Sequence, residues 1–167
     1  MNYTFEKRRD IYTDLWAGMD IRPERLSIVT RQADRIIENR DKYEAIQHTT
    51  GVPWYLIGLM HLRESNLNFT RHLHNGDSLE RRTVRVPAGR PLNGTGPFTF
   101  QESAEDALRQ KGLDKIKDWS IERVAYTLEQ FNGFGYVARG INSPYLWAST
   151  NHYTRGKYIR DHVFSAS

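Results

Sequence analysis

The longest apolar run of this sequence, from Val52 to Leu62, is about as long as one buried helix. A helix that crosses a bilayer needs about 20 apolar residues in a row, and Trp54, Tyr55 and His61 interrupt this run. Its apolar side chains would lie on nearly every side of the helix, which is typical of a helix inside a protein core. We therefore predict a central buried helix over about 54–66 and no stable insertion into a membrane.

The composition fits a single globular domain and excludes several kinds of chemistry. The chain has 167 residues, of which 38% are hydrophobic, and this is enough for one packed core. It has no cysteine, which excludes disulfides, zinc–thiolate sites and cysteine nucleophiles. The first residues, MNYTFEKRRDIY, are charged and include no apolar segment. We therefore expect no signal peptide and a cytoplasmic location until the protein is released.

Apolar periodicity and capping residues predict further helices around the central one. Gly, Ser and Pro mark their ends, as these residues often do. The expected helices are residues 4–17 ended by Gly18, Pro23 to about Gln47 ended by Thr49-Thr50-Gly51, one capped by Ser103, one capped by Ser120, and about Arg155 to Val163.

Between Phe69 and Arg90 the pattern changes from helical spacing to alternation. Residues 70–74 and 83–86 alternate, and Asn75-Gly76 between them is a strong signal for a hairpin. This pattern predicts a small, polar, three-stranded antiparallel sheet. The expected fold class is therefore α+β, mostly helical, with the sheet beside a cleft.

Glu64 is the first candidate for a catalytic residue. It lies near the C-terminal end of the predicted central helix. Burial and the negative end of the helix dipole both disfavour a charged carboxylate, and both would raise its pKa. A general acid needs a raised pKa to hold a proton near neutral pH. The alternative is a structural ion pair with Arg63 or another arginine nearby.

A second carboxylate is expected on the hairpin. Asp77 follows the Asn-Gly turn, where solvent would keep it ionised. A protonated acid that faces an ionised carboxylate is the arrangement that cleaves glycosidic bonds. Thr83 lies six residues later, and its hydroxyl could help Asp77 to hold a water molecule. The alternatives are an ordinary turn residue at Asp77 and an ordinary strand residue at Thr83.

These residues resemble the catalytic segment of the lysozyme superfamily. The six-residue step from Asp77 to Thr83 is similar to the pattern of T-even phage lysozymes, and Glu64-Ser65 also resembles the Glu-Ser pair of goose-type lysozymes and lytic transglycosylases. The string HLHNGDSLERRTVRVPAGRP, followed by PFTFQESAEDAL, is most similar to lysozyme-like proteins of phages and prophages. The resemblance extends over residues 51–162.

One spacing departs from the T-even pattern. The step from Glu64 to Asp77 is thirteen residues, which is longer than in that family. Glu80 and Glu102 are therefore alternative candidates for the second carboxylate.

The resemblance implies a single lysozyme-like catalytic domain over residues 1–167, with N-terminal helices in 1–50 and the catalytic core in 51–162. It implies a glycoside hydrolase, an N-acetylmuramidase, that cleaves the β-1,4 bond between MurNAc and GlcNAc in bacterial peptidoglycan without a cofactor. Such an endolysin acts as a monomer and collects in the host cytoplasm until a holin admits it to the periplasm and wall, where it causes lysis.

The resemblance also implies where the sugar would bind. The segment from Phe131 to Tyr136 is similar to a Tyr-Asn-x-Gly segment that lines the cleft in related families. An Asn side chain can bond an N-acetyl group, and glycines let the backbone approach the sugar. The alternative for the aromatic residues, Trp147 included, is an ordinary place in the core. The expected substrate-binding residues are Ser65, His72, His74, Asn132, Gly133, Tyr136 and Tyr145.

Three other functions remain open from the sequence. A lytic transglycosylase would use Glu64 alone and leave 1,6-anhydro ends. A zinc-dependent wall amidase or peptidase could use His72, His74 and Asp77, with His61 nearby, although no HExxH motif is present. A module that binds polyanions would use the basic segment, but no nucleic-acid-binding motif is present, so no nucleic-acid partner is expected. The arginines concerned are Arg63, Arg71, Arg81, Arg82, Arg85 and Arg90.

Overall fold

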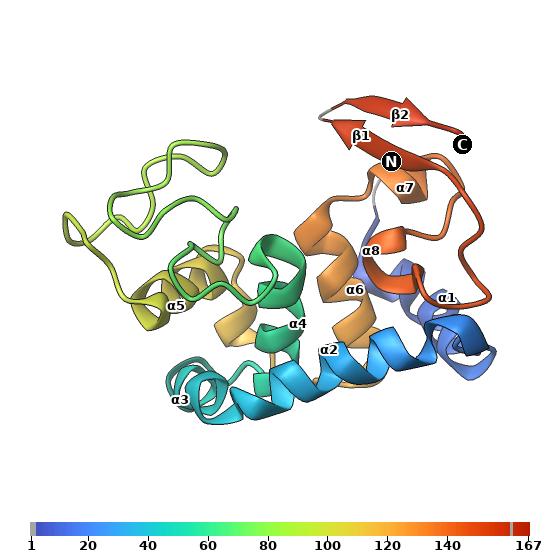
Figure 1. The fold of residues 1–167 in the computed structure, drawn as a ribbon, viewed down its shortest axis with the longest axis horizontal. Coiled ribbons are helices and arrows are strands. Elements are labelled where there is room, and N and C mark those ends of the chain that lie inside the picture. The colour runs from blue at the N-terminus through green and yellow to red at the C-terminus, as the bar shows by residue number, and fades with distance from the viewer. Residues whose placement is uncertain (1–2, 161) are drawn as a thin grey trace. The chain divides into compact units, whose positions relative to one another are not determined.

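The computed structural model describes residues 3–160 and 162–167, and it is mostly helical (Figure 1). None of the helices in these two stretches is long and apolar enough to cross a membrane. The elements are α1 (Phe5–Ala17), η1 (Pro23–Arg25), α2 (Leu26–Glu38), α3 (Arg40–Thr50), α4 (Trp54–Ser65), α5 (Phe100–Gln110), η2 (Leu113–Lys115), α6 (Ile121–Asn132), α7 (Gly135–Ala138), α8 (Pro144–Trp147), β1 (Lys157–Arg160) and β2 (Val163–Ser165).

The chain divides into two compact units. The terminal unit combines Met1–Thr30 with Trp119–Ser167, and the middle unit is Arg31–Asp118. Helix α2 begins in the terminal unit and continues into the middle unit. Residues from the first and last parts of the sequence thus build one unit, and the expected core region 51–162 contributes residues to both units.

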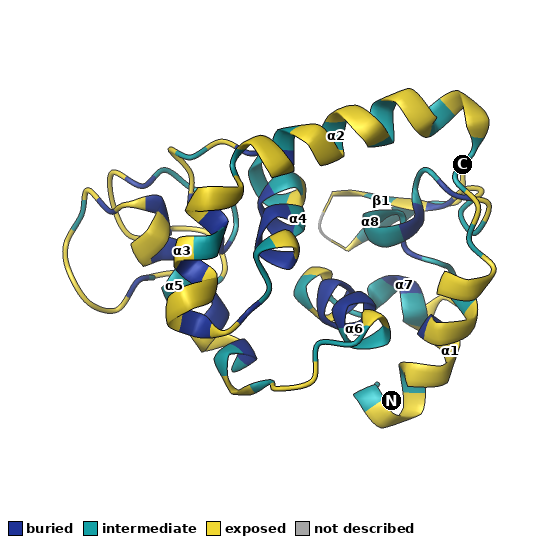
Figure 2. Ribbon diagram, turned by 90° about the horizontal axis from the view of Figure 1, so that it is seen from below, coloured by how far each residue is buried: buried dark blue, intermediate teal, exposed yellow. Residues whose placement is uncertain are grey.

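The middle unit is built around α4, as the sequence predicts. Helix α3 packs on both α4 and α5, and Leu56 and Met60 of α4 are fully buried (Figure 2). Gly58 lies under the side chains of Ile36 and Tyr43, which occupy the space that a Cβ would need. A glycine is therefore required at this point, and the central position of α4 is confirmed.

The terminal unit has its own core. Helix α1 packs on α6, and α6 packs on α8. The side chain of Ser120 accepts a hydrogen bond from the backbone amide of Arg123, which confirms the predicted cap of α6. The buried cluster comprises Tyr12, Ala125, Tyr126 and Trp147, with Phe5, Leu15, Met19, Phe134, Leu146 and Tyr153 packed around it.

The predicted helix from Pro23 to Gln47 is interrupted. Asn39 is not helical, with φ −105° and ψ 15°, and it separates α2 from α3. Its side-chain amide donates to the carbonyl of Arg35 at 2.9 Å, so the side chain competes with the helical hydrogen bonds of the backbone. The predicted end of the second half is confirmed, because Gly51 caps α3 with φ 76°.

Ser103 does not cap α5, contrary to the prediction. The cap is Thr99, whose side chain accepts from the amide of Glu102, while the Glu102 carboxylate accepts from the amide of Thr99. This reciprocal pair is a capping box, which satisfies two helix-end amides at once. Ser103 lies one turn further on and is buried.

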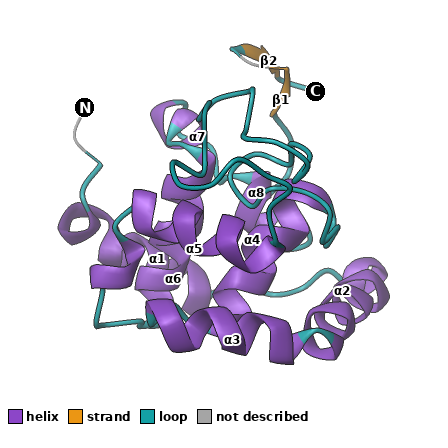
Figure 3. Cartoon of the chain, turned by 90° about the vertical axis from the view of Figure 1, so that its left-hand side faces the viewer, coloured by secondary structure: helices purple, strands orange, loops and turns teal. Residues whose placement is uncertain are grey.

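The predicted three-stranded sheet is wrong. Residues 69–98, called the 69–98 segment below, contain only an isolated bridge between Arg71 and Ser78 (Figure 3). The sheet in the described residues has two antiparallel strands, β1 and β2. It lies where a helix over 155–163 was predicted, and the ring of Tyr158 pairs across the strands with that of Phe164 at 5.3 Å. Aromatic cross-strand pairing therefore decides this segment.

Candidate active site

Glu64 lies in the last turn of α4 and is half-buried. The helix ends one residue later, at Ser65, because Asn66 and Leu67 have positive φ values of 53° and 62°. Arg35 of α2 donates to the side-chain oxygen and the carbonyl oxygen of Asn66, both at 2.9 Å. The end of α4, and with it the backbone position of Glu64, is thereby held against α2.

The predicted hairpin turn lies against this helix end. The amide of Gly76 donates to the carbonyl of His72, and the amide of His72 donates to the carbonyl of Asp77, which closes the turn over residues 72–77. A Cβ at Gly76 would lie 2.9 Å from the carbonyl oxygen of Glu64. Only glycine, with φ 78° here, permits this approach. The turn that carries Asp77 is thus in contact with the residue predicted to be the acid.

Asp77 is ionised and bound on both oxygens. Oδ2 accepts from the amides of Val84 and Arg85, at 2.8 and 2.9 Å, and Oδ1 accepts from Nε of Arg85 at 2.6 Å. Partial burial acts to raise the pKa of Asp77, but these hydrogen bonds outweigh it and lower the pKa from 3.8 to about 2. The carboxylate therefore joins the 72–77 turn to residues 84–85.

The side chain of Thr83 is likewise held by hydrogen bonds within the protein. Its hydroxyl donates to the carbonyl of Pro87 and accepts from the amide of Arg90. The backbone of Thr83 also bonds to Arg90 and Gly89. Thr83 is buried, and its hydroxyl proton is used within the loop 83–90 rather than beside Asp77.

Two predicted histidines take part in one buried network. Nδ1 of His72 lies 2.8 Å from the hydroxyl of Ser103, and its Nε2 lies 2.8 Å from the carbonyl of Arg81. His74 lies 2.6 Å from the carboxylate of Asp106, which also accepts two bonds from the guanidinium of Arg90. Burial lowers the pKa of His74, against the influence of Asp106. The network joins the 72–77 turn, the loop 83–90 and α5.

This network has a structural role and is not a catalytic or metal site. Ser103, His74 and Asp106 follow one another like a nucleophile, a base and an orienting acid, but Ser103 is fully buried, and its hydroxyl also contacts His72 and the amide of Leu73. A substrate cannot reach it. The histidine nitrogens are bonded to protein groups, and no three His, Cys, Asp or Glu residues of the described chain are grouped as metal ligands. The zinc site suggested from the sequence is therefore not assembled.

His61 is part of the core. It lies against the rings of Phe69 and Phe100, at 4.6 and 4.2 Å between centroids, and its Nδ1 bonds the hydroxyl of Tyr43 at 2.9 Å. Burial lowers the pKa of His61 to about 4, so the ring is neutral at physiological pH.

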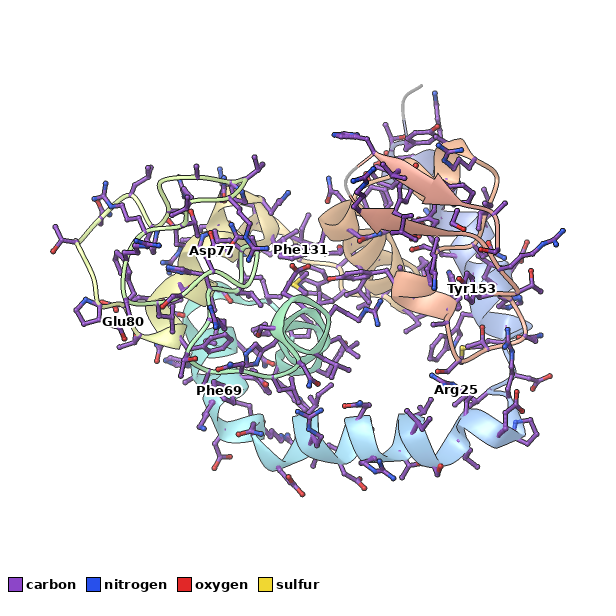
Figure 4. All side chains as sticks on the ribbon, turned by 45° about the horizontal axis from the view of Figure 1, so that its top comes forward. Arg25, Phe69, Asp77, Glu80, Phe131 and Tyr153 are labelled. Carbon is purple, nitrogen blue, oxygen red and sulfur yellow. The ribbon has the colours of Figure 1, made fainter. Side chains whose placement is uncertain are left out.

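The other acidic candidates lie elsewhere in the middle unit. Glu80 is exposed, and Figure 4 shows it apart from Asp77 on the outer side of the 69–98 segment. Glu102 is held in the capping box of α5. The hydroxyl of Ser65 makes only long contacts, of 3.5 and 3.4 Å, with the carbonyls of His61 and Asn68.

Several arginines of the basic segment make contacts within the protein. Arg82 donates to the carbonyls of Leu92 and Gly94, Arg85 pairs with Asp77, and Arg90 pairs with Asp106. Backbone carbonyls and carboxylates thus bind charges that a polyanion-binding module would need. Arg71 and Arg81 are exposed.

The remaining predicted residues belong to the terminal unit. Asn132 is exposed at the end of α6, and Gly133 follows with φ 90°. Tyr136 is buried; its hydroxyl accepts from the amide of Tyr158, so this ring supports the sheet. Tyr145 is half-buried on α8, whereas Trp147 is in the core.

The sequence analysis missed two acidic residues. Asp106 lies three residues after Ser103, so the two share one face of α5, and this spacing was the available signal. Glu129 lies four residues after Ala125 on the apolar face of α6 and is only 2% exposed. Burial raises the pKa of Glu129 to about 7, although Arg8 acts to lower it.

Comparison with known proteins adds no relative. No family model, no curated protein and no solved structure matches this chain.

Proposed function

We propose that the protein is a lysozyme-like N-acetylmuramidase that hydrolyses bacterial peptidoglycan with Glu64 as the general acid. In this proposal it is an endolysin that waits in the host cytoplasm, needs a holin to reach the wall, and acts as a monomer. No cofactor takes part, because proton transfer alone cleaves a glycosidic bond.

The observation that carries the proposal is the place of Glu64. It is half-buried in the last turn of α4, a core helix of the middle unit, and its backbone carbonyl contacts a glycine turn that carries an ionised aspartate. A partly buried carboxyl group near the C-terminal end of a helix is a suitable general acid for this reaction, while hydrogen bonds keep Asp77 charged. Two carboxyl groups on segments that contact each other suit glycoside hydrolysis.

A lytic transglycosylase is the second candidate, and the contacts of Asp77 and Thr83 favour it. Arg85 and two amides bind the carboxylate of Asp77, and the loop 83–90 binds the hydroxyl of Thr83. A mechanism that uses Glu64 alone does not need either group to position water. Mass spectrometry of digested peptidoglycan separates the two reactions, since hydrolysis leaves reducing MurNAc and the transglycosylase leaves 1,6-anhydro ends.

The central test is Glu64→Gln, which keeps the size of the side chain and removes the acidic proton. We expect the rate of lysis of chloroform-permeabilised Gram-negative cells to fall by about 10²–10⁴-fold, which is the usual contribution of a general acid. Circular dichroism and thermal unfolding should match the wild type.

Glu80→Gln is the matched control, because it removes an exposed carboxylate from the same unit. We expect it to lyse cells like the wild type. Lysis by Glu64→Gln at near the wild-type rate would reject the assignment. Activity should also survive phenanthroline on substrate without its outer membrane, whereas loss restored by zinc would indicate a metal-dependent amidase.

A further inference from the structure

A pocket of about 330 Å³ lies within the terminal unit and is separate from every residue discussed above as a catalytic candidate. The loops 140–142 and 152–156 and the end of β2 line it; Figure 4 labels Tyr153 on the second loop. This volume is at the small end of the range of ligand sites, roughly 300–1,000 Å³, and suits one sugar ring or a dipeptide.

One wall of the pocket is apolar and fixed. A Cβ at Gly156 would lie 2.9 Å from the ring of Phe164 and 3.2 Å from Cδ1 of Ile141, so both side chains pack against this glycine. Gly156 also has φ 92°, which other residues rarely adopt. The guanidinium of Arg139 lies over the Phe164 ring at 4.3 Å and holds it in place.

Polar groups line another part. The amide nitrogen of Asn142 donates to the carbonyl of His152 at 3.1 Å, which fixes that side chain and leaves its oxygen as an acceptor. Thr154 and Arg155 also line the pocket and are exposed. Neither side chain makes an ion pair or hydrogen bond within the described residues, so one hydroxyl and one guanidinium are available to a ligand.

The charge of this part of the sequence favours an anion. Between Glu129 and Asp161 there is no Asp or Glu, but there are four basic residues. Their number equals the net charge of +4 of the whole chain. A cluster of one sign raises the local concentration of ligands of the other sign. The basic residues are Arg139, Arg155, Lys157 and Arg160.

We propose that this pocket is a second ligand site, for a small carboxylate with an apolar group. The carboxylate pairs with Arg155, and the apolar group lies on Ile141 and Phe164. Guanidinium–carboxylate pairs are directional and charge-assisted. The proposed function supplies two sources of such a ligand in the cell wall, and the inference depends on it for the source alone: the carboxyl end of a D-alanyl peptide, or the lactyl carboxylate of a muramic acid.

The test is an NMR titration of the whole protein in its Glu64→Gln form, so that no bond is cleaved during the measurement. The probes are D-alanyl-D-alanine and N-acetylmuramic acid, each with a counterpart that lacks the carboxylate, D-alanyl-D-alanine amide and N-acetylglucosamine. We expect saturable shifts of the amides of Gly140, Thr154 and Gly156 with a carboxylate probe. The probe that binds more tightly identifies the source.

Arg155→Gln should weaken binding about tenfold, which corresponds to the loss of one charge-assisted bond. Lys157→Gln is the matched control, because it removes the same charge from the same segment but does not line the pocket. We expect it to change the dissociation constant less than about twofold, since only the general field weakens.

The site is rejected if the pocket amides show no saturable shift, if the uncharged counterparts bind equally well, or if Lys157→Gln weakens binding as much as Arg155→Gln. None of these results depends on lysis. If no probe binds the pocket but the wild-type protein lyses cells, this inference alone is rejected. If Glu64→Gln lyses cells at near the wild-type rate, the proposed function alone is rejected.

Discussion

Charged side chains find hydrogen-bond partners in the 69–98 segment, whereas a carboxyl oxygen between α1 and α6 finds none among the described residues. In the segment, Asp77 accepts three hydrogen bonds, and Arg82 donates to two carbonyls. Between α1 and α6, Glu129 is almost fully buried, and its Oε1 has no hydrogen-bond partner in the described structure. The pKa of one carboxyl is lowered to about 2 and that of the other is raised to about 7.

The difference follows from how the backbone amides and carbonyls of each region are hydrogen-bonded. Helices bond their own amides and carbonyls, so a carboxylate on a buried helix face finds few donors left. A segment without helices or strands leaves these groups open, and charged side chains bond to them instead. Irregular structure therefore stabilises charge here, whereas regular structure excludes it.

The largest effect on stability is expected from Asp106→Asn. Asp106 accepts from Arg90 and His74, and its side chain is 18% exposed. The substitution leaves the guanidinium without its counter-charge, and we expect a loss of about 3 kcal/mol in the free energy of unfolding. Urea denaturation would measure it. Glu80→Gln, in the same unit, should change stability by less than about 0.5 kcal/mol; similar losses in both variants would contradict the role of the network.

A smaller effect, dependent on pH, is expected from Glu129, which faces Tyr12 and Arg8 of α1. Its folded pKa of about 7 exceeds the ordinary value of 4.5. Its contribution to stability is therefore complete below about pH 4.5 and is lost as the pH rises through 7. We expect the wild type to lose on the order of 2–3 kcal/mol between pH 5 and pH 8 for this reason.

Glu129→Gln should lack that loss, because the amide does not ionise. Thermal unfolding over the same pH range would show it, with Glu122→Gln on the same helix as the matched control that retains the wild-type loss. A parallel decline in all three proteins would show that another group is responsible.

The smallest effect is expected from Asp77→Asn. Because Arg85 is 67% exposed, solvent screens much of this ion pair, and we expect a cost of about 1 kcal/mol at pH 7. The sign with pH is opposite to that of Glu129. The folded pKa is lowered, so the stabilisation is present above about pH 3.8 and is lost as the pH falls through about 2. An unchanged difference between variant and wild type at pH 7 and pH 2 would contradict this explanation.

Local patterns in the sequence predicted the elements that depend on local interactions. Helices α1, α4 and α6 follow from apolar spacing, and Gly18, Gly51 and Ser120 mark ends that the structure confirms. The 69–98 segment was misread because alternation indicates a strand only where backbone groups pair. Here the amides of Val84 and Arg85 bond to the side chain of Asp77 and not to a neighbouring strand.

In the candidate site, too, the sequence predicted the local features and missed the contacts between distant residues. The Asn-Gly turn and the ionised state of Asp77 follow from residues that are close in sequence. The partners of His74 do not, because Asp106 lies 32 residues away and the contact depends on the packing of α5. Glu129 was missed because a single carboxyl among apolar residues looks like an exposed position of an amphipathic helix.

The terminal unit is assembled from both ends of the chain, and this has a consequence for synthesis on the ribosome. Residues 31–118 emerge as one uninterrupted stretch, so the middle unit has all its parts while α6 is still to be made. Helix α1 emerges before the middle unit, but the helix on which it packs begins only at Ile121. Until then its buried face, with Tyr12, has no partner. A helix that leaves the ribosome before the whole middle unit is thus among the last to be packed.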